Sequence, residues 1–128
     1  MDRLQGKRVL LVEDEPTIAV TLGDELAERG CAVACVADGA AAVALLAGGG
    51  FDAVVTDVRL PGADGREVVR AARRFVPAAP VLVITAAPPP WLQAADRGGA
   101  DGVLTKPFPN DLVAAWLQQR WRAERSSA

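Results

Sequence analysis

Residues 9–16 read VLLVEDEP, an apolar run that ends in three consecutive acids and a proline. The run is typical of a buried strand, and Pro16 suits the first turn of a helix that follows it. Three carboxylates at the end of a buried strand repel one another unless a positive charge lies near them. The stretch therefore predicts a strand-to-helix junction that carries a polar site.

The alternation of apolar run and helical segment continues along the whole chain. The strands are continuous apolar runs, which indicates burial on both faces and hence a parallel sheet between two layers of helices. Five such units predict an α/β domain with an open, doubly wound, three-layer fold. The predicted strands cover residues 8–13, 32–36, 53–56, 81–85 and 102–105.

Capping and breaking residues place helices between these strands. Gly30 ends the first helix, which carries an apolar stripe at helical spacing, and Asp38 caps the second. The run Pro88–Pro90 precedes a short fourth helix, because prolines fix the backbone and remove donors. The third helix is predicted to begin near Asp64, and the fifth to cover about residues 109–122.

The bulk composition is that of a single globular domain, with 51% hydrophobic and 23% charged residues. We expect one domain over 1–128, with a core over about 7–122 and a frayed tail over 123–128. Scattered basic residues and a net charge of −2 argue against nucleic-acid binding. Because the chain shows neither a signal peptide nor the ~20 apolar residues of a membrane span, we expect a cytoplasmic protein without membrane contact.

Cys31 and Cys35 are the two cysteines, and the chain has no histidine. In an intact strand these cysteines would lie about 13 Å apart, beyond the ~7 Å that a disulfide allows, so we interpret both as small core residues. The lack of histidine excludes Ser-His-Asp triads, Cys-His pairs and most zinc sites. It also means that the chain could receive a phosphoryl group from a histidine but not donate one.

Polar residues follow four of the predicted strands, at the sheet edge where open parallel sheets bind ligands. Glu13 and Asp14 follow the first strand, Asp57 the third, and Lys106 the fifth, while Thr85 ends the fourth. In a sheet of order 2-1-3-4-5 these ends are neighbours. The edge would then hold three carboxylates, one hydroxyl and one ammonium.

These groups are suited to binding a metal ion and a phosphoryl group. Three crowded acids cannot all stay ionised without a cation, and oxygen ligands of this kind suit magnesium. A metal ion with open positions can bind a phosphoryl oxygen, and an aspartate can accept the phosphoryl group covalently. The chain contains no GxxxxGK[ST] motif, and acids rather than glycines follow the first strand, so no loop there cradles a nucleotide phosphate. The residues therefore predict a site for one phosphoryl group.

Four stretches, VLLVEDEP, VVTDVRLPGADG, VLVITA and ADGVLTKPF, make the chain resemble the receiver domain of bacterial two-component response regulators from end to end. The resemblance implies a flavodoxin-like (βα)5 fold with strand order 2-1-3-4-5. It implies a response regulator that accepts a phosphoryl group from a histidine kinase or a histidine phosphotransfer protein, and that catalyses only its own phosphorylation and dephosphorylation. Met1 favours a stand-alone receiver acting through a downstream protein, and a piece of a longer protein is the alternative.

The resemblance also assigns roles to single residues. Asp57 is implied to be the phosphoacceptor, and Lys106 to neutralise it and then the phosphoryl group. Thr85 is implied to turn toward that group on activation. Magnesium, with manganese as an alternative, is expected to bind Asp57, Asp14 and Glu13, the last of these directly or through water, and the backbone carbonyl of Arg59.

Three further positions relate to the switch. Ala86 is small, as the family's pattern requires, and the Lys106–Pro107 peptide bond is expected to be cis. Val103 stands where the family usually has an aromatic ring that moves inward as the threonine moves. A valine cannot move in this way, so the coupling of phosphorylation to the outer surface of the domain is in doubt, whereas the chemistry at Asp57 is not.

The face built from the fourth helix, fifth strand and fifth helix is the family's usual docking and dimer surface, and a homodimer through it is possible. Trp91, Trp116 and Trp121 lie in or beside these helices. In the last helix, Leu112 and Trp116 form one stripe beside a second of Val113, Leu117 and Trp121. We expect one stripe to be core and the other exposed.

Two other functions compete with phosphoryl transfer. A degenerate receiver could act as a phosphorylation-independent interaction module, which Val103 favours and the intact set of acceptor-site residues disfavours. A hydrolase with an aspartyl-phosphate intermediate is the second rival, but such phosphatases carry D-x-D on the first strand and a cap domain, which this chain lacks.

Overall fold

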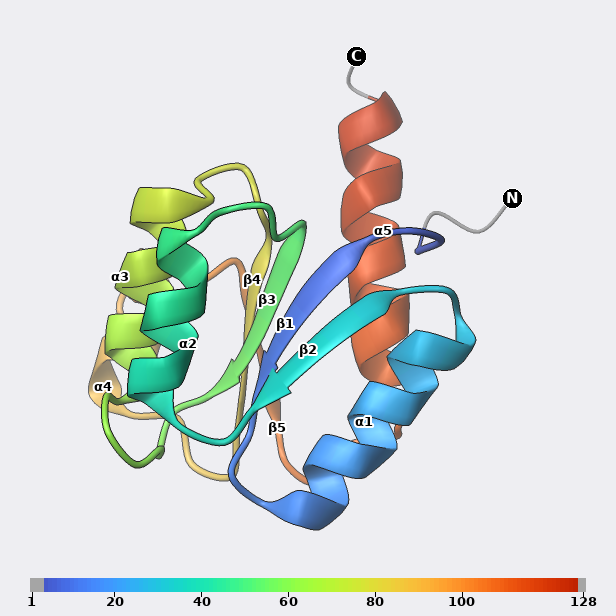
Figure 1. Cartoon of the computed structure of the whole chain (residues 1–128). Coiled ribbons are helices and arrows are strands. Elements are labelled where there is room, and N and C mark those ends of the chain that lie inside the picture. Colours follow the sequence, from blue (N-terminus) through green and yellow to red (C-terminus); the bar gives the residue numbers. More distant parts are fainter. Residues whose placement is uncertain (1–3, 127–128) are drawn as a thin grey trace.

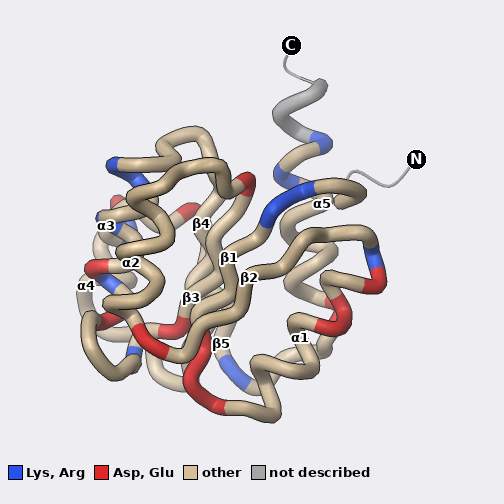
Figure 2. The backbone as a smooth tube through the Cα atoms, viewed as in Figure 1, with Lys and Arg blue, Asp and Glu red and all other residues tan. Residues whose placement is uncertain are grey.

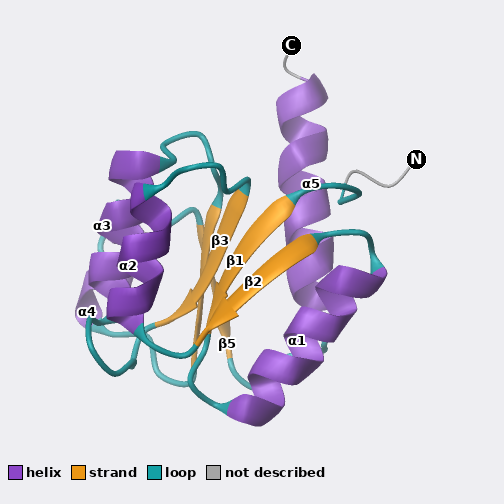
Figure 3. Cartoon of the chain, viewed as in Figure 1, coloured by secondary structure: helices purple, strands orange, loops and turns teal. Residues whose placement is uncertain are grey.

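The computed structural model describes residues 4–126 and forms one parallel sheet with helices on both faces (Figures 1 and 3). The strand order β2-β1-β3-β4-β5 confirms the predicted topology. The strands are β1 (Arg8–Val12), β2 (Ala32–Val36), β3 (Ala53–Asp57), β4 (Val81–Thr85) and β5 (Gly102–Thr105). The helices are α1 (Pro16–Glu28), α2 (Gly39–Ala47), α3 (Gly65–Phe75), α4 (Pro90–Gln93) and α5 (Leu112–Ser126), with a 3₁₀ turn η1 (Arg97–Gly99).

The sheet separates two apolar clusters. Residues of α2, α3 and α4 pack on one face, and residues of α1 and α5 pack on the other (Figure 1). Alternate residues of β1 belong to different clusters: Leu10 packs with α2 and α3, and Leu11 with α1 and α5. β1, β3 and β4 are therefore covered on both faces, which is why they appear in the sequence as unbroken apolar runs.

β2 lies at an edge of the sheet and is only partly buried. Cys31, just before it, is buried and Cys35 is exposed, and neither forms a disulfide. The prediction that they do not form a disulfide is confirmed, but the prediction that Cys35 is a core residue was wrong. An edge strand has a neighbour on one side only, so an apolar run there does not guarantee burial.

Local caps set the helix boundaries as predicted for the first three helices. Asp38 accepts hydrogen bonds from the backbone N–H groups of Ala40 and Ala41, at 2.6 and 3.1 Å. Asp64 caps α3 in the same way, by accepting from Glu67 N–H at 3.1 Å. Gly30 follows α1 with φ of +96°, a left-handed conformation that favours glycine after a helix.

The last two helices differ from their predicted bounds. α4 begins at Pro90 itself, because proline is tolerated at the first helical position. α5 begins at Leu112 rather than Pro109, since residues 109–111 form a turn in which Leu112 N–H donates to the Pro109 carbonyl. It continues to Ser126 rather than ending at Arg122, and the end of the predicted frayed tail, residues 127–128, lies outside the described residues.

The two stripes of α5 separate only in part, because Trp116, in the same stripe as Leu112, packs against the core. Val113, Leu117 and Trp121 are buried against the sheet, whereas Leu112 is 37% exposed and Trp116 is half-buried. Over residues 4–126, no helix combines the length and the apolar character that crossing a bilayer requires.

Candidate functional site

The polar residues predicted from the sequence meet where the parallel strands end. Figure 2 shows acidic segments at this lower edge of the sheet. The register places Val12 beside Thr56 and Asp57 beside Ile84, so the residues that follow β1 lie next to the end of β3. Thr85 pairs with Thr105, which brings Lys106 to the same edge.

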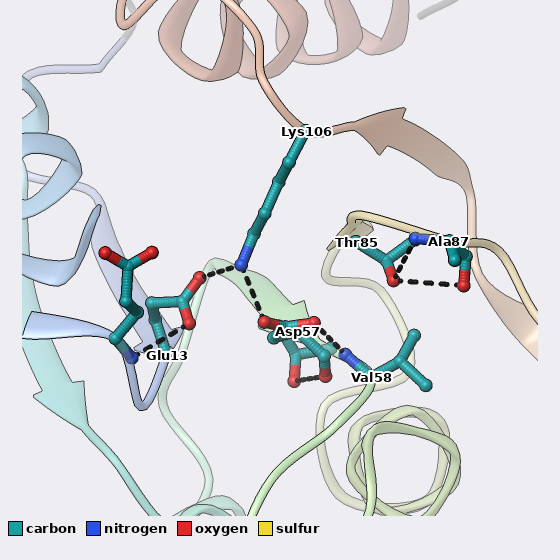
Figure 4. A network of polar contacts seen from close by, with 8 residues as sticks. Glu13, Asp57, Val58, Thr85, Ala87 and Lys106 are labelled. Carbon is teal, nitrogen blue, oxygen red and sulfur yellow. Dashed lines mark hydrogen bonds and ion pairs between the residues drawn. The ribbon is translucent and has the colours of Figure 1, made fainter. Parts of the chain in front are cut away.

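One ammonium joins two of the carboxylates. Lys106 Nζ donates to Glu13 Oε1 at 2.6 Å and to Asp57 Oδ2 at 2.7 Å (Figure 4). The remaining oxygens bind backbone N–H groups: Glu13 Oε2 accepts from Glu15 at 3.1 Å, and Asp57 Oδ1 accepts from Val58 at 2.6 Å. Both carboxylates are therefore held in fixed orientations by donors on three segments of the chain.

These charged groups are largely removed from water. The Glu13 side chain is fully buried, and those of Asp57 and Lys106 are 11% and 15% exposed. Burial raises the pKa of the Glu13 carboxyl, and the hydrogen bond from Lys106 offsets only part of that rise. Burial acts to lower the pKa of the Lys106 ammonium, but its bonds to Asp57 and Glu13 outweigh burial, and the pKa is raised. The Lys106 ammonium therefore holds its proton more firmly than an ordinary lysine, because two carboxylates share it.

Asp14 completes a cluster of three acids. One carboxylate oxygen from each of Glu13, Asp14 and Asp57 lies within 4.8 Å of the others, and Asp14 is exposed. When all are ionised, these three carboxylates and the Lys106 ammonium leave a charge of −2, which one divalent cation would neutralise. An all-oxygen donor set with a solvent-facing member fits a hard cation that keeps some of its waters, such as magnesium.

The Thr85 hydroxyl is not part of this cluster. Thr85 is buried, and its Oγ1 lies 3.3 Å from Ala87 N and 3.4 Å from Ala87 O, so the side chain turns toward the loop after β4 (Figure 4). Ala86, between them, is exposed. The sequence gives no sign that Ala87 is the partner of Thr85, because both contacts use backbone atoms of Ala87.

The other predicted positions lie around the site without joining the ion-pair network. Arg59 is exposed two residues beyond Asp57, and the role of its carbonyl as a ligand stays a prediction. The Lys106–Pro107 bond is cis, as predicted, and Pro107 is exposed. Val103 is partly buried and packs on the cluster that includes α3 and α4.

Two features of the site were not predicted. The contact between Glu13 and Lys106 joins residues 93 apart in the chain, and nothing local in the sequence signals it. Gly65 lets α3 approach the end of β3, because a Cβ on it would lie 2.3 Å from the Asp57 carbonyl oxygen. A glycine directly after the capping Asp64 was the available signal for this close approach.

Known proteins that resemble this chain belong to the family that the site residues indicate. The model of the response regulator receiver domain family matches residues 9–118. The transcriptional regulatory protein TcrA of Mycobacterium tuberculosis is 48% identical over 118 residues, which are 91% of this chain and 46% of TcrA. The chain thus spans about half the length of this curated relative.

Two solved structures share the fold. The receiver domain of the sensor histidine kinase PA1611 from Pseudomonas aeruginosa, with a magnesium ion coordinated in its active site cleft, is 31% identical, with a TM-score of 0.76 over 89% of this chain and 96% of that one. A CheY-like receiver domain protein from Methanospirillum hungatei is 20% identical, with a TM-score of 0.87 over 97% of this chain and all of that one, and this likeness supports the fold alone.

Proposed function

Because this chain belongs to the response regulator receiver domain family, we propose that Asp57 accepts a phosphoryl group from the phosphohistidine of a histidine kinase or a histidine phosphotransfer protein. The observation that carries the proposal is the position of Lys106 Nζ, 2.7 Å from Asp57 Oδ2 and 2.6 Å from Glu13 Oε1. The ammonium balances the charge of the Asp57 carboxylate and orients it at the open edge of the sheet, where a donor can reach it.

The transfer forms one bond and breaks one. A carboxylate oxygen of Asp57 attacks the phosphorus, the phosphorus–nitrogen bond of the donor breaks, and the electron pair returns to the imidazole. Lys106 stays beside the acyl phosphate and compensates the charge of its oxygens. Water later attacks the phosphorus of the acyl phosphate, which restores Asp57 and releases inorganic phosphate.

A divalent cation would be held by Glu13, Asp14 and Asp57, together with the backbone carbonyl of Arg59. Magnesium is the proposed ion and manganese the alternative, since both prefer oxygen ligands. When bound, the ion supplies positive charge for the phosphoryl oxygens and relieves the repulsion among the three acids.

The proposed switch is Thr85. Turning its hydroxyl toward the phosphoryl group would break both contacts with Ala87, and would release the loop that leads to α4. The α4–β5–α5 face is the proposed surface for the downstream protein and for a homodimer. Val103 has no ring that could move together with Thr85. The contacts between Thr85 and Ala87 are therefore the remaining connection between the phosphorylation site and this face.

The degenerate-receiver alternative is not favoured. An interaction module that is never phosphorylated has no need of a buried carboxylate pair held by a buried ammonium, because such groups are costly to desolvate. Glu13, Asp57 and Lys106 are nevertheless all present and joined. No enzyme family acting on other substrates is indicated by the comparisons.

The test of this proposal is metal-dependent labelling by a small acyl-phosphate donor. Incubation with such a donor and magnesium is expected to add the mass of one phosphoryl group to the intact protein, and incubation with a chelator to add none. Asp14→Asn removes one carboxylate of the metal cluster, so this variant is expected to need about tenfold or more magnesium for the same labelling, in line with the loss of one ligand charge.

Asp24→Asn is the matched control, because Asp24 is an exposed acid on α1, away from the strand ends. It is expected to label like the wild type at every magnesium concentration. Labelling that proceeds equally in the presence of the chelator, or an Asp14→Asn variant with an unchanged magnesium requirement, would count against the proposed metal site.

A further inference from the structure

The segment from Gly30 to Phe51, which contains β2 and α2, has a single charged residue, Asp38. A helix that is apolar all round is normally buried, because a surface helix turns charged or polar side chains toward water. α2 nevertheless lies on the surface, beside α3 and at the β2 edge of the sheet (Figures 1 and 3). Its apolar outer side is therefore a feature that the fold of one chain does not explain.

The buried and exposed residues of α2 separate by helical spacing. Ala42 and Leu46 are buried in the apolar cluster that α2 shares with α3. The opposite side of the helix is exposed, and we call it the α2 face: Ala40, Ala41, Ala44, Leu45 and Ala47. Leu45 supplies its one large side chain, which is 42% exposed. The exposed residues of the neighbouring α3 are all charged, so the apolar surface is confined to α2.

The N-terminal end of this helix layer is acidic. Asp38 and Asp64 cap α2 and α3, and Glu67 follows in the first turn of α3. Arg66, the basic residue of that turn, lies over the Trp91 ring of α4, at 5.7 Å from its centre, and so on the side of α3 that faces away from α2. The surface beside the start of α2 therefore carries a net negative charge.

The C-terminal end of the same layer is basic. The Arg8 guanidinium donates to a backbone carbonyl of the loop after α2 at 3.1 Å, and Arg74 is exposed in the last turn of α3. Asp52 accepts from the Arg8 N–H at 2.8 Å and offsets one of these charges. Arg73 is already paired with Asp101. Figure 2 shows the acidic segments at the lower end of this layer and the basic ones at its upper end.

We propose that the α2 face binds the same face of a second copy of this chain, with the two α2 helices antiparallel. A twofold axis between the helices sets the acidic end of each copy against the basic end of the other, and it also opposes the two helix dipoles. A parallel arrangement would set acid against acid. The charge pattern is thus self-complementary, as a contact between identical surfaces requires. Leu45 of each copy packs on the alanines of the other.

This inference goes beyond phosphoryl transfer and does not rest on it. The α2 face lies at the β2 edge of the sheet, whereas the α4–β5–α5 face lies at the β5 edge. The two surfaces are therefore distinct, and the α2 face is present with Asp57 unmodified. The dimer is expected in the unphosphorylated protein.

The first experiment is sedimentation equilibrium of the whole unphosphorylated chain. One helix face is a small interface, so half of the wild-type chains are expected to be dimeric at about 10–100 µM. Leu45→Glu is expected to weaken the dimer at least about tenfold, because the symmetry places the unpaired charge in the interface twice. Val20→Glu, at a position 62% exposed on α1, is the matched control and is expected to dimerise like the wild type.

Charge reversal tests the antiparallel orientation. Arg74→Glu and Glu67→Arg are each expected to weaken the dimer at least about threefold, since each sets like charges against one another across the twofold axis. The variant with both changes carries opposite charges at the two ends again, and it is expected to recover most of the wild-type affinity. Two changes that simply add would contradict this orientation.

A crosslink locates the contact independently of the affinity. Ala44→Cys in a Cys35→Ser background places a thiol at the middle of the α2 face, where the twofold axis brings the two copies of residue 44 together. A short bismaleimide is expected to couple two such chains. Ala27→Cys in the same background, at an exposed position on α1, is the matched control and is expected to stay uncoupled. Cys31 is buried in both variants.

A wild-type chain that stays monomeric up to about ten times the expected midpoint would overturn the inference and leave a different protein as the occupant. A dimer that Leu45→Glu leaves intact, or one that does not couple through position 44, would overturn it as well. A dimer that Leu112→Glu on α5 disrupts instead would place the contact on the α4–β5–α5 face, with the same consequence. Because no phosphoryl donor is present, none of these results bears on Asp57.

Discussion

Asp57→Asn is expected to abolish phosphoryl incorporation, with labelling by a small acyl-phosphate donor reduced at least about 100-fold, because an amide oxygen is a far weaker nucleophile than a carboxylate. The substitution keeps the shape of the side chain and an oxygen that can accept from Val58 N–H. Lys106 keeps its bond to Glu13. The measurement is intact mass after incubation with donor and magnesium.

The control for this variant is again Asp24→Asn, which makes the same chemical change on the exposed surface of α1. It is expected to incorporate one phosphoryl group like the wild type. Thermal unfolding of both variants confirms that the loss of labelling reflects chemistry rather than misfolding. An Asp57→Asn protein that is folded and still labels at the wild-type level would refute the assignment of the acceptor.

Lys106→Met is expected to cost roughly 3 kcal/mol of unfolding free energy in metal-free buffer, because it leaves buried anions without their cation. Glu13 is 1% exposed and Asp57 is 7% exposed, so water replaces the ammonium only poorly. Adding Glu13→Gln to this variant removes one of the two stranded charges and is expected to recover part of the loss. Denaturant unfolding of the single and double variants measures both effects.

The pH dependence of Lys106→Met has a defined sign. Burial raises the pKa of Glu13 above its ordinary value of 4.5, and the variant also loses the hydrogen bond that partly offsets this rise. The folded state then binds a proton more tightly than the unfolded state, so stability increases as the pH falls through the raised pKa toward 4.5. The deficit of the variant relative to the wild type is therefore expected to shrink on acidification.

Lys7→Met is the matched control, because Lys7 is the other lysine of the chain. Its ammonium lies 5.0 Å from the centre of the Trp121 ring, a contact worth about 1 kcal/mol at most when exposed. Lys7→Met is expected to lose only a little unfolding free energy, and this loss is expected to be the same at neutral and mildly acidic pH. If Lys106→Met behaved like Lys7→Met, the ammonium would not be stabilising the two carboxylates.

The strands and helix caps could be predicted because their signals were local and strong, whereas the strand order came from the resemblance to the receiver family. Buried central strands appear as unbroken apolar runs, so the bounds of β4 match the prediction. Asp38 and Asp64 could be assigned as caps because capping depends on the next three residues alone. The exposure of Cys35 was missed because burial was inferred from the apolar run alone, although the order 2-1-3-4-5 places this strand at the edge of the sheet.

The residues of the site could also be predicted, but not all their contacts. Strand ends of a parallel sheet converge, so Glu13, Asp57 and Lys106 could be placed together from their positions along the chain. That Lys106 would bond to Glu13 as well as Asp57 depends on side-chain orientation. The Asp101 ion pairs were missed for the same reason, since Arg73 and Arg120 belong to different helices. Asp101 alone is indistinguishable from an ordinary loop residue.

The most direct test of the account is to locate the phosphoryl group in the wild-type protein. After incubation with magnesium and an acyl-phosphate donor, borohydride reduction converts an aspartyl phosphate to homoserine, which peptide mass spectrometry identifies by position. The account predicts homoserine at position 57, and unmodified aspartate at positions 14 and 52. Homoserine at another position, or none at all in a protein that has gained phosphate, would contradict it.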